Sequence, residues 1–248
     1  MTPPRLSRVL SPSPPPTVEH GNTNSFYNPN WGPGYPKLFT QQYEGFDEFM
    51  TSVFDRVRRL SSTTSELYKP SFNPALQQEY TKNLLLLEQM MNSSSWFHQP
   101  DHSSFEQAQY ATTETRICAP TWHASTLLYI YIILRKMPSS TTLVQKILGR
   151  VTSTLQALTP TELWCHFPKN FLLWVLTLGG VACTNRPHDL DWYVMCLRHL
   201  RGIMGLEEWV DVKQVLTGFA WVEYMCELVF RRVWEKVLAV ESAEQGGK

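Results

Sequence analysis

The chain of 248 residues lacks an excess of either charge, because 22 lysines and arginines are balanced by 22 aspartates and glutamates. A dedicated nucleic-acid-binding domain usually carries a basic excess, since phosphate contacts supply much of its affinity. We therefore expect no direct sequence-specific DNA binding by this chain. A net charge near zero also favours association at neutral pH, so a homodimer is kept open.

Paired cysteines are also lacking. The five cysteines never occur as Cys-x-x-Cys; they are Cys118, Cys165, Cys183, Cys196 and Cys226. An odd number without paired spacing argues against a secreted disulfide framework and favours a reducing compartment. Cys196 and His199 are three residues apart, which places them on one helix face, and Cys183 lies upstream. No second close pair completes four ligands, so no metal site is predicted.

Long hydrophobic runs are absent as well. The two most apolar segments, Leu127–Leu134 and Phe171–Cys183, are shorter than the ~20 residues that a membrane-spanning helix needs. We expect both to be buried core helices, with no membrane association. The stretch Met1–Pro16 is rich in proline and serine and has no apolar segment of the kind found in signal peptides.

Recognisable sets of catalytic groups are missing too. The sequence contains no phosphate-binding glycine loop, nucleophile elbow or zinc-protease helix motif. Glu207, Glu208 and Asp211 crowd the start of a predicted helix, where two carboxylates would suit acid–base chemistry. The helix dipole also favours acidic residues in a first turn, and we prefer that interpretation. We therefore predict no enzyme, and no catalytic, cofactor-binding or metal-binding residue.

Proline and glycine are concentrated near the N-terminus, in stretches such as SPSPPP and NPNWGPGYP. Such a segment buries too little apolar surface to offset its ordering entropy. The sequence thus predicts a disordered Pro/Ser/Gly-rich tail over residues 1–38 and a helical domain over residues 41–240. Trp31 lies in the tail and is either a docking anchor or a residue without function.

Apolar residues recur every three or four positions through most of the remaining chain, and no stretch alternates with period two. This pattern predicts an all-α fold, a multi-helix globular bundle. The predicted helices begin near Gln41 and then cover Pro74–Met91, Phe105–Ile117, Thr121–Lys136, Ser140–Leu158, Pro168–Ala182, His188–Arg201, Glu207–Phe219 and a last segment ending at Val240.

Several helix ends carry recognisable signals. Asn73 is predicted to cap the second helix and Ser140 the fifth. The segment Thr159–Glu162 has the pattern of a capping box. Arg56, Arg58 and Arg59 lie on the polar side of the first helix, where they fit either a solvated helix end near the negative dipole pole or contact with an anionic partner.

Tryptophan and glycine mark the C-terminal half. Five tryptophans in helical segments are predicted core anchors, namely Trp174, Trp192, Trp209, Trp221 and Trp234. Gly179 and Gly180 lie inside an apolar helix, where glycine costs about 1 kcal/mol relative to alanine. Either the close approach of a neighbouring helix offsets this cost or the pair simply marks a helix end. Glu227, Arg231 and Glu235 have the spacing of intrahelical ion pairs.

Three sequence blocks carry a family resemblance. They are LLWVLTLGGVA (Leu172–Ala182) with the Arg-rich helix after it, WVDVKQVLTGFAWVEYMC (Trp209–Cys226), and Val233-Trp234. Their order resembles the C-terminal part of the fungal-specific transcription factor domain, the helical regulatory region of zinc-cluster regulators, and Thr121–Leu158 fits the preceding helix pair. Such regulators often begin with a six-cysteine zinc cluster, whereas the first cysteine here is Cys118, so no DNA-binding residue is carried over.

The resemblance implies a non-enzymatic, transcription-regulator-like module without its own DNA-binding domain. It would act through protein contacts in the nucleus, or otherwise the cytoplasm, with transcriptional machinery or a DNA-binding regulator as partner. Two alternatives stay open. One is a small-molecule-binding helical protein, or an enzyme with an unrecognised site, with Trp122, His123, Tyr129 and Tyr131 lining an apolar pocket. The other is a truncated regulator without independent activity.

Overall fold

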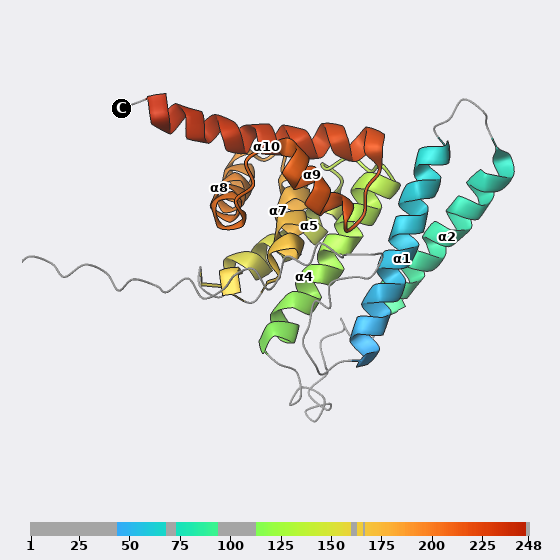
Figure 1. The fold of residues 1–248 in the computed structure, drawn as a ribbon. Helices are drawn as coiled ribbons and strands as arrows, with labels where there is room; N and C mark the ends of the chain where they lie inside the picture. The colour runs from blue at the N-terminus through green and yellow to red at the C-terminus, as the bar shows by residue number, and fades with distance from the viewer. Residues whose placement is uncertain (1–43, 68–72, 94–112, 160–162, 166, 247–248) are drawn as a thin grey trace, which may run out of the picture. The chain divides into compact units, whose positions relative to one another are not determined.

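A computed structural model describes residues 44–67, 73–93, 113–159, 163–165 and 167–246 of the chain. These ranges form helices and contain no strand, which confirms the predicted all-α fold (Figure 1). The predicted tail over residues 1–38, with Trp31, lies outside the described residues. So do residues 105–112 of the third predicted helix and residues 160–162 of the predicted capping box.

The first two helices follow the predicted patterns. Helix α1 (Glu44–Leu67) buries the apolar stripe of Met50, Val53, Phe54, Val57 and Leu60. Helix α2 (Pro74–Ser93) begins after Asn73, whose side-chain oxygen accepts hydrogen bonds from the backbone N–H groups of Ala75 and Leu76 at 3.1 and 3.2 Å. The predicted Asn73 cap is therefore confirmed. The two helices pack against each other.

The third described helix, α4 (Thr113–Tyr129), runs through Pro120. The predicted break between Ile117 and Thr121 is therefore wrong. A proline inside a helix costs about 3 kcal/mol, but Pro120 is exposed, and every residue from Thr121 to Ile130 is buried. Burial of that whole segment offsets the cost. The π-helix η3 (Ile130–Leu134) follows directly, with the Arg135 N–H donating to the Ile130 carbonyl at 2.9 Å.

Helix α5 (Thr142–Gln156) begins one residue later than predicted, because Thr141 and not Ser140 occupies the N-cap position. Thr141 has extended backbone angles and makes no side-chain capping bond. The apolar periodicity of this segment predicts a buried stripe that starts at Leu143 and includes Ile147, Val151 and Leu155. These last three are buried, but Leu143 is 41% exposed and Val144 is buried in its place. Helix α5 packs against α4 and α7.

Helix α7 (Lys169–Ala182) is the centre of the described fold. It begins after Pro168, as predicted, and every residue from Phe171 to Ala182 is buried. It contacts α4, α5, α8, α9 and α10, and Figure 1 shows it inside the group that these helices form. A helix that is apolar all round is expected only where neighbours cover every face.

The glycine pair in α7 marks close packing. A Cβ atom on Gly179 would overlap the ring of Tyr193 on α8 (Pro187–Met204). A Cβ atom on Gly180 would lie 2.8 Å from a methyl group of Val233 on α10 (Glu223–Gly246). The structure thus favours the close-approach explanation over a simple helix end. The two glycines allow two different helices, α8 and α10, to pack closely against α7.

The last three helices complete the described fold. Helix α8 ends at Gly205, which has a left-handed backbone conformation (φ 65°) suited to glycine. Helix α9 (Trp209–Thr217) is short, and α10 extends past the predicted end at Val240 to Gly246. Helix α10 packs along α7 and α8 (Figure 1). Within the described ranges, no helix combines the length and apolar character required to cross a membrane.

Candidate functional site

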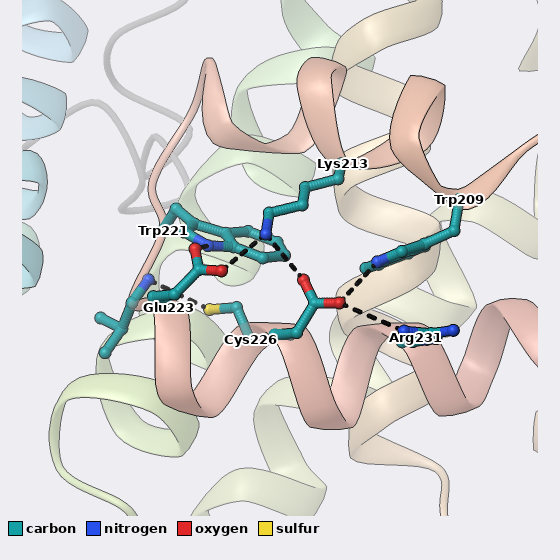
Figure 2. A network of polar contacts seen from close by, with 8 residues as sticks. Trp209, Lys213, Trp221, Glu223, Cys226 and Arg231 are labelled. Carbon is teal, nitrogen blue, oxygen red and sulfur yellow. Dashed lines mark hydrogen bonds and ion pairs between the residues drawn. The ribbon is translucent and has the colours of Figure 1, made fainter.

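Polar and aromatic side chains gather where α9 meets the start of α10 (Figure 2). We call this group the α9–α10 cluster; it consists of Trp209, Lys213, Trp221, Glu223, Glu227 and Arg231. Helix α9 supplies Trp209 and Lys213, the linker supplies Trp221, and α10 supplies the other three. Residues four apart in a helix share a face, so both helices present these side chains toward the junction.

Helix α9 begins with a capping box. The Glu208 carboxylate accepts a hydrogen bond from the backbone of Asp211, and the Asp211 carboxylate accepts one from the Glu208 N–H at 3.3 Å. These bonds satisfy N–H groups that a helix start leaves without partners. The structural interpretation of the acidic residues at this helix start is therefore supported for Glu208 and Asp211, and Glu207 is exposed just before them.

Lys213 is the hub of the α9–α10 cluster. Its ammonium lies 2.6 Å from Oε1 of Glu223 and 3.0 Å from Oε2 of Glu227. The same ammonium lies 5.5 Å from the centre of the Trp221 ring, within the range of a cation–π contact. One cation of α9 thus holds two carboxylates of α10 and the linker between the helices.

The two indole rings hold the same carboxylates from the other side. The Trp209 N–H donates to Glu227 at 2.8 Å, and the Trp221 N–H donates to Glu223 at 2.5 Å. Their ring centres are 6.4 Å apart. Of the five predicted core anchors, Trp174 and Trp234 are buried, while Trp192, Trp209 and Trp221 are half-buried. The prediction that they are core anchors is wrong for these three. Trp209 and Trp221 lie near the surface because each indole N–H requires a hydrogen-bond partner, which Glu227 and Glu223 provide.

Arg231 extends the cluster along α10. Its guanidinium lies 3.7 Å from Glu227 and 3.3 Å from Glu235. Both predicted intrahelical ion pairs are therefore confirmed. Since Arg231 and Glu235 are more than half exposed, each such pair contributes only a few tenths of a kcal/mol, on the order of 0.3–0.5.

The charges of the cluster alter one another's pKa values. Hydrogen bonds to Glu223 and Glu227 raise the pKa of Lys213, and the hydrogen bonds from Lys213 and Trp221 lower the pKa of Glu223. Burial pushes the pKa of Glu227 upward, but hydrogen bonds from Lys213 and Trp209 outweigh it and leave this pKa lowered. All three groups are therefore held in their charged forms near neutral pH, which suits adhesion between helices and not proton transfer.

A buried polar contact lies beneath the cluster. The Tyr129 hydroxyl is 3.0 Å from the Ser61 hydroxyl, which donates to the Val57 carbonyl at 2.8 Å. The Cys226 thiol accepts a hydrogen bond from the Val222 N–H at 3.4 Å and interacts with Tyr129. Burial raises the pKa of Cys226 to about 12, so its thiol is protonated at neutral pH. These contacts connect α1, α4 and α10.

Arg58 connects α1 to the end of α9. Its Nε donates to the Phe219 carbonyl at 3.0 Å, and its Nη2 donates to the Gly218 carbonyl. A helix C-terminus leaves carbonyl groups unpaired and carries partial negative charge, so a guanidinium there is favourable. One of the two interpretations of Arg56, Arg58 and Arg59 placed them at a solvated helix end. This is wrong for all three, because α1 continues to Leu67, and Arg58 also reaches another helix.

Residues predicted to line a small-molecule pocket serve in packing instead. Trp122 is fully buried and packs edge-on against Phe54, with ring centres 5.8 Å apart. His123 is buried with its Nε2 3.0 Å from the Met91 carbonyl, and Tyr129 is fully buried. Tyr131, the fourth residue, is half-buried. These contacts join α1 and α2 to α4.

The three residues considered for a metal site lie in different environments. Cys183 is buried at the end of α7, whereas Cys196 is half-buried on α8. The His199 ring is exposed and packs against Trp164 at a tilt of 46°, with ring centres 4.6 Å apart. Among the described residues, no group of three histidine, cysteine or acidic side chains is arranged to hold a metal ion.

Sequence reasoning missed Lys213 and underestimated Arg58. The spacing of four between Trp209 and Lys213, and again from Glu223 to Glu227 to Arg231, was a usable signal for two facing helix surfaces. No local pattern signals the Arg58 contact, because its two acceptors lie 160 and 161 residues further along the chain.

The described residues define a helical protein in which polar side chains join helices to one another. The sequence matches the profile of the fungal-specific transcription factor domain over residues 15–219, and the chain belongs to that family. The match reaches further toward the N-terminus than the resemblance noted from the sequence, and it ends before α10. No curated protein and no solved structure matches the chain. Membership indicates a regulatory role in transcription, in a family that is in general non-enzymatic and acts in the nucleus.

Proposed function

We propose that this chain is a non-enzymatic regulatory module that controls transcription through protein contacts. The family match over residues 15–219 is the observation that carries the proposal. Its partner would be a DNA-binding regulator or a component of the transcriptional machinery, and its place of action the nucleus. Fold-level kinship alone does not define a mechanism, so the remaining support comes from the residues themselves.

The balance of charge supports protein contacts over direct DNA binding. The 248 residues have zero formal net charge and contain no Cys-x-x-Cys pair that would suit a zinc-cluster DNA reader. Of the three arginines on α1, Arg58 donates to two backbone carbonyls. A DNA-binding surface would require a concentration of unengaged basic side chains.

The use of polar groups supports a non-enzymatic role. The carboxylates that come closest to an acid–base pair, Glu223 and Glu227, are both held by Lys213 and by an indole N–H. A general base requires a pKa near the operating pH, whereas the pKa values of both carboxyl groups are lowered. The cluster is therefore suited to fixing α9 and its linker on α10.

Tethering the chain to a promoter tests the proposal. The full chain is fused to an unrelated DNA-binding domain, and expression of a reporter with the matching site is compared with that given by the DNA-binding domain alone. A change in reporter expression, of either sign, is expected. In parallel, a gel-shift assay with a pool of random DNA sequences should show no sequence-specific binding by the unfused chain.

Two glycine variants serve as matched controls in the reporter assay. Gly179→Leu should abolish the effect, because its side chain would overlap Tyr193 and disrupt packing. Gly149→Ala should leave the effect intact, because a Cβ atom there meets no other atom within 4 Å. A folded fusion that leaves the reporter unchanged, or sequence-specific DNA binding by the unfused chain, would contradict the proposal.

A further inference from the structure

The last turns of α1 contain five consecutive hydroxyl residues, Ser61 to Ser65. Four of these hydroxyls are engaged, because each donates to the backbone carbonyl four residues before it. The bonds are Ser61 to Val57 at 2.8 Å, Thr63 to Arg59 at 2.9 Å, Thr64 to Leu60 at 2.7 Å and Ser65 to Ser61 at 3.3 Å. Ser62 makes no such bond in the described part of the chain, and its side chain is exposed.

Basic residues precede Ser62 in the sequence. Arg59 lies three positions before it, Arg58 four and Arg56 six, and both Arg56 and Arg59 are exposed. Kinases select substrates through such charge patterns, because acidic groups near their active sites attract arginines at fixed distances from the acceptor hydroxyl.

We propose that Ser62 is a phosphorylation site for an arginine-directed protein kinase, and that the phosphate releases Arg58 from the end of α9. The step is a phosphoryl transfer from a nucleoside triphosphate. The Ser62 oxygen bonds to the γ-phosphorus, the bond from that phosphorus to the bridging oxygen breaks, and the nucleoside diphosphate leaves. The hydroxyl proton passes to the base of the kinase.

The neighbouring Ser61 is a poor competitor in the folded chain, although Arg58 precedes it by three residues and Arg59 by two. Its side chain is buried, and its hydroxyl is shared between the Val57 carbonyl and the Tyr129 hydroxyl. Both of these serines of α1 thus have an arginine three residues before them, and of the two only Ser62 is exposed.

The consequence follows from what surrounds Ser62. It lines a hollow of about 330 Å³ between α1 and the α9–α10 linker, together with Arg58, Glu66, Trp221 and Glu223. A phosphate would add about −1.5 to −2 charges between two carboxylates. Arg58, one helical turn before Ser62, is the cation that lines this hollow. A charged phosphate outcompetes the neutral carbonyls of Gly218 and Phe219 for a guanidinium, so α1 loses its hold on the end of α9.

The test treats the full chain with the catalytic subunit of cyclic-AMP-dependent protein kinase and magnesium ATP, and maps phosphate by mass spectrometry. We expect phosphate on Ser62, and its loss in Ser62→Ala to the level of the control without kinase. Ser61→Ala and Ser65→Ala should retain it, and Arg59→Ala should slow its incorporation. No phosphate on Ser62 of the wild-type chain, or phosphate mapped to Ser61 in its place, would overturn the assignment. Because Ser62 is exposed, the Ser62→Ala variant should have the melting temperature of wild type, and this measurement verifies that the variant is folded.

Hydrogen exchange tests the release of Arg58. Amides of residues 218–226 should exchange faster in the phosphorylated chain than in the untreated chain. Arg58→Ala should exchange faster even before treatment, and phosphate should then add little. Kinase-treated Ser62→Ala is the matched control and should exchange like untreated wild type. Unchanged exchange over residues 218–226 after stoichiometric phosphorylation would show that Arg58 stays in place.

Discussion

At the scale of single residues, the two glycines of α7 should differ in their tolerance of substitution. Gly179 faces the ring of Tyr193, whose hydroxyl is 2.9 Å from the Thr152 hydroxyl, so the ring has little freedom to move. Gly180 faces the smaller side chain of Val233, and a Cβ atom there would lie 2.8 Å from its nearest methyl group, a looser fit than the 2.2 Å from Gly179 to the Tyr193 ring. We expect Gly179→Ala to lower the free energy of unfolding by about 1–3 kcal/mol through overpacking, and by more than Gly180→Ala.

Urea denaturation checks this order. Gly149→Ala in α5 is the control, because its Cβ atom would meet open space, and it should stabilise the protein by about 0.5–1 kcal/mol through helix propensity alone. Equal effects of the Gly179 and Gly180 variants would show that the Tyr193 ring moves aside freely.

The cysteines should differ in reactivity for a related reason. Burial raises the pKa of Cys183, Cys196 and Cys226 to about 12 in each case, and Cys118 is buried, whereas Cys165 is exposed. The thiolate is the reactive form. In the native protein at pH 7 we expect a single fast phase of maleimide labelling, which Cys165→Ser removes. Cys196→Ser should leave the fast phase intact, and two fast phases in wild type would contradict this expectation.

At the scale of elements, the junction of α9 and α10 should depend on pH at both extremes. Glu223 and Glu227 have lowered pKa values, so their stabilising contribution is present above about pH 4.5 and is lost as pH falls. Lys213 has a raised pKa, so its contribution is present below about pH 10.5 and is lost as pH rises further. Between these limits the contribution of the junction should be constant.

Lys213→Met isolates this contribution, because methionine keeps an apolar stem beside Trp221. We expect a loss of about 1 kcal/mol at pH 7, since the two ion pairs are partly exposed. The difference between wild type and variant should shrink as pH falls below about 4.5 and passes through the lowered pKa values of the two carboxyl groups. Lys236→Met, an exposed lysine on α10, is the control. A difference that stays constant down to pH 3 would attribute the effect to packing alone.

The helices also show which features the periodicity of apolar residues predicts and which it does not. The three- and four-residue periodicity, which places Met50, Val53, Phe54, Val57 and Leu60 on the buried face of α1, and the Asn73 cap were correctly predicted because their causes are local. The continuation of α4 through Pro120 was not, because burial of the following segment by other helices decides it. Lys213 and Arg58 have partners in other elements, so only the assembled structure reveals their roles.

At the scale of the whole molecule, α10 lies outside the region that matches the family but belongs to the same hydrophobic core. The family match ends at residue 219, before α10 begins at Glu223. Yet α10 packs along α7 and α8 and buries Phe230, Val233, Trp234 and Val237. Gly180 in the matched region has no room for a side chain because Val233 of α10 lies against it. The matched region is therefore shaped to receive α10, and the two form one structural unit.

Ending the chain after Val222 should consequently abolish cooperative folding. Full burial of Phe230, Val233 and Val237 contributes about 5–9 kcal/mol at 1.5–3 kcal/mol per side chain, which is comparable to the total stability of a typical domain, about 5–15 kcal/mol. Circular dichroism during heating should show a sharp transition for the full chain and a broad, shallow one for the shortened chain. Leu228→Ala in the full chain is the control, since Leu228 is 53% exposed and its loss should leave the transition sharp. A sharp transition in the shortened chain would mean that residues up to 222 fold alone and that α10 is an addition to a complete core.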